Sequence, residues 1–296
     1  MKILNFGSLN IDHVYEVAHF VQAGETLASQ SLENFPGGKG LNQSIAAARA
    51  GACIYHAGRV GKDGAFLVEL LSASGADISL IQTGEGPTGH AIIQVSPQGE
   101  NCILLFAGEN RRITSEQIAH ALKQFAPGDL LLVQNETNAV ADLLCQAHQK
   151  GMQVAFNPSP IDDALTSLPL DYVDWFILNE IEAQALTGEQ RPDKAAQTML
   201  TRWPKAHIVL TLGAQGALYL DAGQRLYQPA LPADVVDTTA AGDTFTGYFL
   251  AAVTSGQSPK QALLLAAQAA ALAISVKGAA VSIPTKDQVA AFYPHG

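Results

Sequence analysis

The residues with the clearest chemical role lie between Val236 and Gly247, where the sequence reads VDTTAAGDTFTG. Three consecutive small residues there allow a tight turn that lets backbone N–H groups face a ligand. They are Ala240, Ala241 and Gly242. A helix is predicted over residues 244–255, and its N-terminus offers free N–H donors and a dipole that favours an anion. Asp243 stands at the same point. This combination suits phosphoryl transfer to a hydroxyl, because the amides stabilise phosphate charge and the carboxylate accepts the proton.

A second stretch, FPGGKGLNQS at residues 35–44, places three glycines, a lysine and an asparagine at the start of another predicted helix, residues 40–50. Each stretch also has a simpler interpretation. Asp243 could only cap its helix, which is a common role for Asp, and Lys39 could be an ordinary surface lysine. A small-residue turn before a helix is a weak motif by itself, so support must come from the rest of the chain.

Together and in this order, the two stretches resemble the paired signatures of the ribokinase-like sugar kinases, the PfkB carbohydrate kinase family. Five further motifs extend the resemblance over essentially the whole chain, and seven motifs in order are far more specific than any one of them. The five are GSLNID at 7–12, NPSP at 157–160, NEIE at 179–182, TLGAQG at 211–216 and KGA at 277–279.

The resemblance implies an ATP-dependent carbohydrate kinase that phosphorylates the 5-hydroxyl of a pentose, with D-ribose as the first choice. Asp243 would be the general base, and backbone N–H groups would hold the transferring phosphoryl group. Those N–H groups belong to Ala240, Ala241 and Gly242. The sugar would contact Asn10, Asp12, Gly38, Lys39, Asn42, Glu136 and Asp243. Asp12 could instead be a turn residue, and the sequence around Glu136, QNET, matches the family only through its Glu at a strand end.

The implied nucleotide site contains Asn179, Glu182, Thr211, Gly213, Gly216 and Gly242. ATP would bring Mg²⁺, which Asn179 and Glu182 would reach largely through water, because Mg²⁺ gives up its waters reluctantly. A helix cap and a solvated helix face are the alternatives for these two residues. The site is not a P-loop, because the sequence lacks G-x-x-x-x-G-K-[ST]. Ala267 stands where the family often has Asn or His, so the base specificity stays open.

The resemblance also implies a monovalent cation, usually K⁺, held largely by backbone carbonyls. The matching positions are Asp237, Thr239, Val276, Gly278 and Ser282. Val281 departs from the family, which often has Pro before this serine, and the departure falls directly beside an expected cation ligand.

Composition narrows the class of protein. The chain has 296 residues, of which 48% are hydrophobic and 15% charged, so it suits one α/β domain over residues 1–296. A net charge of −10 argues against a nucleic-acid partner. Cys53, Cys102 and Cys145 lack metal-like or paired spacing and are expected to be reduced core residues of a cytoplasmic protein. No signal peptide is expected, and no apolar run reaches the ~18 residues that span a bilayer, so no membrane partner is expected.

The hydrophobic pattern predicts strands that alternate with helices, most regularly from residue 115 onward. This alternation predicts an α/β fold with three layers: a doubly wound, mostly parallel sheet with helices on both faces. Ligands bind beyond the carboxyl ends of the strands in such sheets. The expected site residues obey this rule, since Asn10 and Asp12 follow the first strand, while Glu136, Asn179 and Gly213 follow later ones.

A β-hairpin is predicted from residues 88–95 and 100–106, joined by Ser-Pro-Gln-Gly. A loosely alternating strand is predicted at residues 26–32, within an irregular segment. The resemblance implies that residues 13–35 and 88–106 form a small β lid over the sugar, and that two lids pair in a homodimer. The alternative is a hairpin that merely extends the main sheet.

Other functions stay open at this point. Within the family, the substrate could be deoxyribose, a ketohexose, a keto-sugar acid or a nucleoside. A non-catalytic sugar-binding protein on the same fold would be expected to lack the catalytic Asp or the glycine turn, and both are intact. A nucleotide-binding dehydrogenase would need G-x-G-x-x-G after the first strand, and residues 7–12 lack that pattern.

Overall fold

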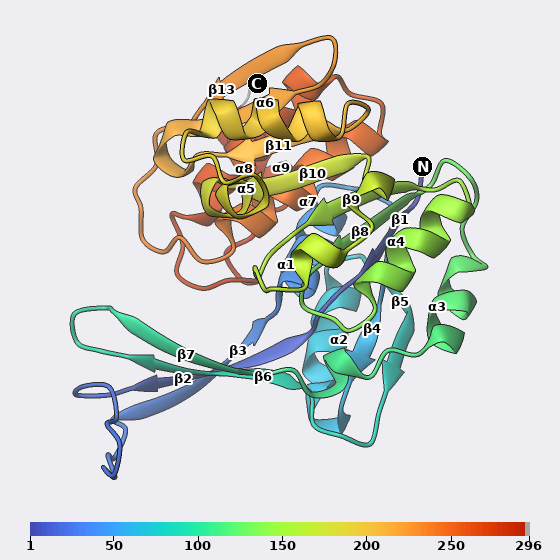
Figure 1. The fold of residues 1–296 in the computed structure, drawn as a ribbon. Coiled ribbons are helices and arrows are strands. Elements are labelled where there is room, and N and C mark those ends of the chain that lie inside the picture. Colours follow the sequence, from blue (N-terminus) through green and yellow to red (C-terminus); the bar gives the residue numbers. More distant parts are fainter. Residues whose placement is uncertain (294–296) are drawn as a thin grey trace.

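A large twisted sheet forms the centre of the protein in the computed structural model, which describes residues 1–293 (Figure 1). Its nine strands lie in the order β13-β12-β11-β10-β9-β8-β1-β4-β5. They are β1 (Ile3–Phe6), β4 (Ile54–Val60), β5 (Asp77–Thr83), β8 (Leu130–Gln134), β9 (Gln153–Asn157), β10 (Trp175–Asn179), β11 (His207–Thr211), β12 (Gly216–Leu220) and β13 (Arg225–Pro229). All neighbours pair in parallel except β11–β12 and β12–β13, which are antiparallel.

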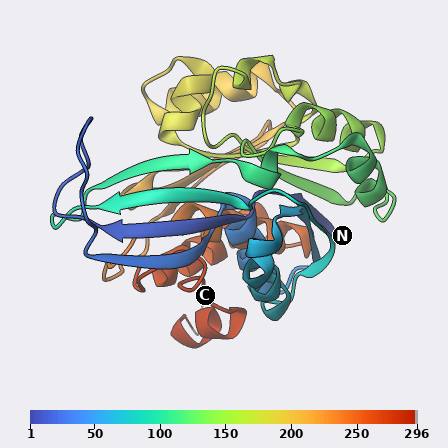
Figure 2. The ribbon, with the colours of Figure 1, turned by 90° about the horizontal axis from the view of Figure 1, so that it is seen from below.

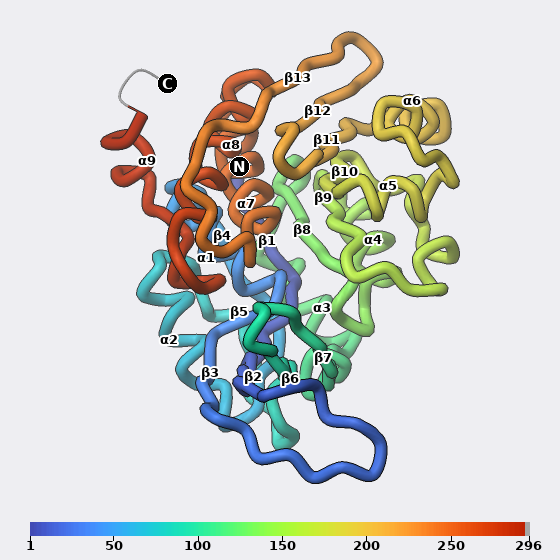
Figure 3. Tube along the Cα trace, turned by 90° about the vertical axis from the view of Figure 1, so that its left-hand side faces the viewer, coloured from blue at the N-terminus to red at the C-terminus, as the bar shows by residue number. Residues whose placement is uncertain are grey.

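Helices cover both faces of this sheet, as Figure 3 shows along the strands. One layer contains α1 (Lys39–Arg49), α2 (Ala65–Ala73), α7 (Ala241–Thr254), α8 (Pro259–Ala273) and α9 (Lys286–Phe292). The other contains α3 (Ser115–Leu122), α4 (Val140–Gln149), α5 (Glu180–Thr187) and α6 (Pro192–Arg202). Each layer shares a separate apolar core with one sheet face. The predicted three-layer, doubly wound α/β fold is therefore confirmed.

A second sheet of four strands projects from this body, in the order β3-β2-β6-β7 (Figure 2). Its strands are β2 (Asn10–Glu16), β3 (Ser31–Gly37), β6 (Gly89–Val95) and β7 (Asn101–Phe106). The predicted hairpin, β6–β7, pairs through β6 with β2 rather than with the main sheet. Two insertions that are distant in sequence thus build one small sheet.

Several local expectations were wrong. Asn10 and Asp12 lie on β2 itself, so Asp12 is not the turn residue of the alternative interpretation. The strand expected at residues 26–32 begins only at Ser31. Within the mostly parallel sheet, β12 runs antiparallel to β11, because the turn between them is too short for a parallel crossover. Strand β13 and helix α9 were not predicted.

The cysteines are also placed differently from the expectation that they are core residues. Cys53 and Cys102 are exposed and Cys145 is half-buried, and all three are free thiols. Cys102 lies on β7, where every residue is exposed because the second sheet is a single layer. No helix among residues 1–293 is long and apolar enough to cross a membrane.

Candidate active site

The expected site residues gather where the strand order of the main sheet reverses. From β1 the chain runs outward through β4 and β5, and from β8 it runs through β9 to β11 on the other side. Because β1 and β8 are parallel neighbours, the residues beyond their carboxyl ends, Ser8 and Glu136, lie together. Helices α1 and α7 pack against each other, so their N-termini meet at the same crevice. Open α/β sheets bind ligands at such a reversal.

Asp243 is held by two amides of the neighbouring helix. It is the third residue of α7, not the N-cap, and its side chain is buried. Asn42 Nδ2 donates to its Oδ2 at 3.0 Å, and Gln43 Nε2 donates to its Oδ1 at 2.9 Å. Asn42 Oδ1 is buried and has no partner among the described residues, so it remains available to a ligand hydroxyl. Each carboxylate oxygen of Asp243 therefore accepts a hydrogen bond from an amide side chain.

The N-terminus of α7 presents backbone N–H groups beside this carboxylate. Ala240, the N-cap, has a left-handed conformation with φ 60°, and it is the only residue other than Gly with positive φ in the described part of the chain. The first intrahelical bond runs from Thr244 N to Ala240 O at 2.8 Å, while Ala241 N already donates to Thr238 O at 3.2 Å. Gly242 N precedes the intrahelical bonds and is thus a better placed anion donor than Ala241 N.

Asp243, Gly242 and the neighbouring motifs line one cavity of about 210 Å³. The other expected site residues in its wall are Lys39, Asn179, Glu182, Thr211, Ala240 and Ala241. Motifs from four distant parts of the sequence are therefore brought together around one cavity. The structure adds Asn157 and Ser159 of the NPSP motif to this wall.

Lys39 supplies positive charge to a group of carboxylates. Glu136 accepts hydrogen bonds from Ser8 Oγ and, at 3.0 Å, from the backbone N–H of Lys39. Burial raises the pKa of Glu136, although the Lys39 ammonium and these hydrogen bonds oppose the rise. Burial alone would lower the pKa of Lys39, but the charges of Asp243, Glu136 and Glu182 raise it above its ordinary value. Lys39 is thus a partly buried cation facing the site, not a solvated surface lysine.

Asp12 lies near Glu136 at the start of the second sheet. Burial and the charge of Glu136 raise the pKa of Asp12 to about 6, against the opposing effect of His13. A Cβ atom on Gly37 of β3 would stand 2.2 Å from Asp12 Oδ2, so this glycine leaves room for the carboxylate. Asn10 and Asp12 are two residues apart on one strand and share a face.

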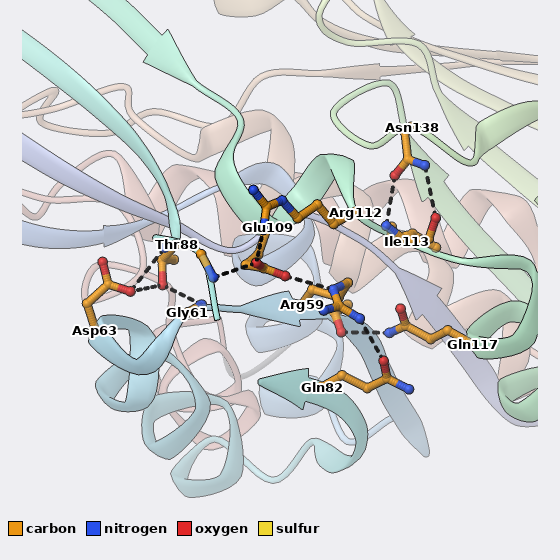
Figure 4. A network of polar contacts seen from close by, with 12 residues as sticks. Arg59, Gly61, Asp63, Gln82, Thr88, Glu109, Arg112, Ile113, Gln117 and Asn138 are labelled. Atoms are coloured by element: carbon orange, nitrogen blue, oxygen red, sulfur yellow. Dashed lines mark hydrogen bonds and ion pairs between the residues drawn. The ribbon is translucent and has the colours of Figure 1, made fainter. Parts of the chain in front are cut away.

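A polar network joins the second sheet to the α/β body (Figure 4). Glu109 belongs to the short 3-10 helix η2 (Gly108–Arg111) that follows β7, and it is fully buried. It accepts hydrogen bonds from Arg59 Nε and from the backbone N–H of Gly86, both at 2.9 Å. Just before β6, at the same open end of the hairpin, Thr88 N and Oγ1 donate to Asp63 Oδ1 at 3.0 and 2.6 Å. Both strands of the β6–β7 hairpin are therefore anchored at its base.

A larger, apolar cavity of about 440 Å³ opens beside the Asp243 cavity and shares Thr211, Thr238, Ala241 and Gly242 with it. Gly213 and Gly216, expected at the nucleotide, line this second cavity, as does Ala267. Among the described residues that line it, only the two threonines have polar side chains, and they lie at the end nearer Asp243. The apolar end suits a flat aromatic base, and the other end suits phosphates.

Asn179 and Glu182 form a reciprocal capping box at the start of α5, which is the helix-cap alternative noted above. Glu182 N donates to Asn179 Oδ1 at 2.9 Å, and Asn179 N donates to Glu182 Oε2 at 2.9 Å. Asn179 Nδ2 also donates to Glu182 Oε1 at 3.0 Å. Both side chains nevertheless line the cavity of Asp243, so the cap holds a carboxylate at the place expected for phosphate-bound Mg²⁺.

The residues expected at a monovalent cation lie on two adjoining loops. Asp237 Oδ1 accepts from Thr239 N at 2.9 Å and from Thr239 Oγ1 at 2.6 Å, while Oδ2 accepts from Gly278 N at 2.9 Å. Ser282 Oγ donates to Ala279 O at 2.9 Å, and the side chain of Val276 is half exposed. No group of three or more His, Cys, Asp or Glu side chains within residues 1–293 is placed to hold a metal ion. A cation here would therefore depend on backbone carbonyls.

Sequence reasoning missed three residues of the site: Ser8, which contacts Glu136, Gln43, which contacts Asp243, and Asn110 of η2. Asn110 Oδ1 accepts from Leu9 N at 3.0 Å, and Asn110 Nδ2 donates to Leu9 O at 3.1 Å and to Asn10 Oδ1 at 2.7 Å. Gln43 carried one usable signal, because it directly follows Asn42 at the start of an otherwise apolar, Ala-rich helix.

Comparisons with known proteins agree with this geometry. The family model described as pfkB family carbohydrate kinase matches residues 1–286. The ribokinase of Haemophilus influenzae is 36% identical over 302 residues, with 98% of this chain and 97% of that protein covered. The ribokinase of Bacillus subtilis is 32% identical, with 97% and 98% covered.

Solved structures show the same likeness in three dimensions. The ribokinase of Cryptococcus neoformans in complex with ADP has a TM-score of 0.88 at 34% identity, covering 98% of this chain and 99% of that one. The Arabidopsis thaliana ribokinase complexed with ribose and ATP has a TM-score of 0.90 at 27% identity, with 99% of both chains covered. The chain therefore belongs to the pfkB family of carbohydrate kinases.

Proposed function

We propose that the protein is an ATP-dependent kinase that transfers a phosphoryl group to the 5-hydroxyl of D-ribose. The observation that carries the proposal is the position of Asp243. It lies in a buried crevice between an apolar cavity of nucleotide size and the acidic pair Asp12 and Glu136. The ribokinase relatives, among them one solved with ribose and ATP, support ribose as the sugar.

In this reaction Asp243 accepts the proton of the attacking hydroxyl. The N–H groups at the start of α7, with Gly242 foremost, stabilise charge on the transferring phosphoryl group. Lys39 adds positive charge on the same side of the cavity. Asp12, Asn10, Gly38, Asn42 and Glu136 bind the sugar hydroxyls. Their carboxylates and amides offer the mixture of acceptors and donors that vicinal hydroxyls need.

The proposed cofactors are ATP, Mg²⁺ and a monovalent cation such as K⁺. Thr211, Gly213 and Gly216 enclose the nucleotide, and Glu182 of the capping box faces the phosphates with their Mg²⁺. The cation would lie between the loops of Asp237 and Ser282. Turnover should fall when K⁺ is replaced by Na⁺ or a large organic cation. Equal turnover with all three cations would contradict the proposed cation site.

The second sheet is proposed to act as a lid and as the contact between two subunits. Its strand β7 exposes four consecutive apolar residues, Ile103 to Phe106, each at least half exposed. An apolar strand whose outer edge is unpaired is unfavourable in water, and a closed lid or a second subunit would cover it.

The exposed free thiols fit a reducing compartment, so we place the protein in the cytoplasm.

A panel of sugars tests the proposed function. ADP release should be fastest with D-ribose, and the product should carry its phosphate at the 5-position. Faster ADP release with deoxyribose, a ketohexose, a keto-sugar acid or a nucleoside would contradict ribose as the substrate but would still support a kinase of this family. Sugar binding without ADP release would instead indicate a non-catalytic sugar-binding protein.

Backbone amides of β6 and β7 should gain protection from hydrogen exchange with saturating sugar if the lid closes.

A further inference from the structure

A chain of buried amides leads from Asp243 into the interior of the protein. Gln43 Nε2 donates to Asp243 Oδ1 at 2.9 Å, and Gln43 Oε1 accepts from Gln134 Nε2 at 2.7 Å. Gln134 Nε2 also donates to Asn5 Oδ1 at 3.1 Å. All three amide side chains are at most 1% exposed. Gln134 ends β8 and Asn5 lies on β1, so the chain of amides crosses the two central strands.

Backbone carbonyls determine the direction of every hydrogen bond in this chain. Asn5 Nδ2 donates to Gly40 O at 2.8 Å, so Asn5 must turn its oxygen towards Gln134. Gln134 therefore presents its NH₂ group, Gln43 receives it on Oε1, and Gln43 Nε2 is left facing Asp243. A flip of the Gln43 amide would place two NH₂ groups against each other and two oxygens against each other.

A second carbonyl locks Gln43 from the other side. Asn157 Nδ2 donates to Ile177 O at 2.9 Å, which leaves Asn157 Oδ1 to accept from Gln43 Nε2 at 3.2 Å. Asn42, the other donor to Asp243, lacks such a lock, because its Oδ1 has no partner among the described residues. The orientation of the Asp243 carboxylate is thus determined mainly through Gln43.

The network is not explained by stability alone. Gln134 Oε1 is buried without a hydrogen-bond partner in residues 1–293, and an unsatisfied buried acceptor lowers the stability of a fold. A carboxylate that acts as a general base must instead hold its free lone pairs towards the hydroxyl proton, and small misplacements lower the rate. Gln134 meets this requirement, because its bond to Gln43 Oε1 leaves Gln43 Nε2 facing Asp243.

We infer that Gln134, with Asn5 behind it, is a positioning residue that orients the base Asp243 through Gln43 without touching either substrate. The inference rests on the proposed kinase function. It predicts that loss of the Gln134 donor lowers kcat, while the KM values for sugar and ATP stay close to those of the wild type.

The test compares Gln134→Met and Gln134→Glu with Gln117→Met. Gln117 is a buried amide on α3 that donates from Nε2 to Gly58 O at 2.9 Å and also has an unpartnered Oε1. Gln134→Met removes the donor at similar length. Gln134→Glu keeps the shape, and its buried carboxyl donates to Gln43 Oε1 or Asn5 Oδ1 while protonated but offers only acceptors once ionised. Gln134→Met should lower kcat roughly tenfold with KM within about twofold, as for a modestly misplaced reacting group. Gln134→Glu should show the same loss only at a pH high enough to ionise the new carboxyl. Gln117→Met should change the melting temperature and leave kcat unchanged.

Several outcomes would overturn the inference. Wild-type kcat in Gln134→Met, or in Gln134→Glu at a pH that ionises the new carboxyl, would do so, provided that the variant folds and binds the sugar normally in calorimetry. An equal loss of kcat in Gln117→Met would show a general packing effect. If Gln134→Met does not fold, Gln134→Glu decides. A wild-type protein without sugar kinase activity would refute the proposed function, whereas an active wild type with unaffected variants would refute the network alone.

Discussion

Asn110 donates a hydrogen bond from Nδ2 to Asn10 Oδ1 at 2.7 Å, and thereby decides which end of the Asn10 amide faces the proposed sugar site. Asn110 itself cannot flip, because it bonds to both the N–H and the carbonyl of Leu9. Asn10 therefore has its NH₂ group free for the sugar in the proposed site, while Asp12 on the same face has carboxyl oxygens.

Asn110→Ala should raise the KM for ribose about five- to tenfold, the effect of losing one oriented hydrogen bond. Asn138→Ala is a matched control, because Asn138 makes the same pair of bonds to a backbone as Asn110 makes to Leu9. Its Oδ1 accepts from Ile113 N and its Nδ2 donates to Ile113 O, both at 3.0 Å (Figure 4). Initial rates over a range of ribose concentrations measure the effect. Equal changes of KM in both variants would mean that Asn110 only stabilises the fold.

Asp243→Asn should lower kcat by roughly 10²-fold or more, the range for loss of a positioned general base. Folding and ribose affinity should stay close to the wild type, since the unlocked Asn42 amide can turn to accept from the new NH₂ group. Asp287→Asn, an exposed first-turn aspartate of α9, is the control. Retention of more than a tenth of wild-type turnover would contradict the general-base role.

Gly242→Ala should raise the stability of the fold and lower the activity. A Cβ atom there would meet no described atom within 4 Å, so the fold accepts it and the helix gains roughly 0.5–1 kcal/mol. The methyl group would project into the cavities that Gly242 lines, so kcat/KM for ATP should fall. Gly247→Ala is the opposite case, because its Cβ atom would stand 2.4 Å from Ala46 Cβ and the unfolding temperature should drop. Unchanged ATP kinetics in Gly242→Ala would place the phosphates elsewhere.

Asp12→Asn should stabilise the protein at pH 7 while it weakens ribose binding. The pKa of Asp12 is raised from 3.8 to about 6, so the folded state binds its proton more tightly than the unfolded state. Ionisation at neutral pH therefore costs stability, of the order of 1–3 kcal/mol, which the amide avoids. The gain should shrink as pH falls through 6 and vanish below about 4, where the carboxyl is protonated in both states. Urea unfolding at pH 7 and pH 4 measures it, and a gain that is equal at both pH values would contradict the raised pKa.

The double substitution Leu104→Lys and Leu105→Lys should produce a monomer, because neighbouring residues of β7 place one charge on each face of the second sheet. Ile181→Lys is the control, since Ile181 is 71% exposed on α5, away from this sheet. Sedimentation at micromolar concentration gives the result. A wild-type monomer would reject the lid-mediated dimer and leave the kinase function untouched.

Much of the fold could be predicted because its signals are local. The strands that end at Phe6, Gln134 and Asn179 show in the sequence as apolar runs. The hairpin β6–β7 could be predicted from its turn sequence, Ser-Pro-Gln-Gly at residues 96–99. The exposure of a side chain could not be predicted in the same way. Cys is usually buried, but Cys102 lies on a strand of the second sheet, which is a single layer in the described part of the chain, and it is exposed.

By itself, the sequence determined the family, the order of the elements and the motifs that carry Asp243, Lys39 and Asp12, because each motif lies within about a dozen consecutive residues. Only the tertiary structure decided how those residues are held. Gln43 and Asp243 are 200 positions apart, and Asn10 and Asn110 are 100 apart. The first pair forms because α1 packs on α7, and the second because η2 packs against β4 and β6 and bonds to Leu9 between β1 and β2. No local periodicity encodes which amide will face which oxygen across such a contact.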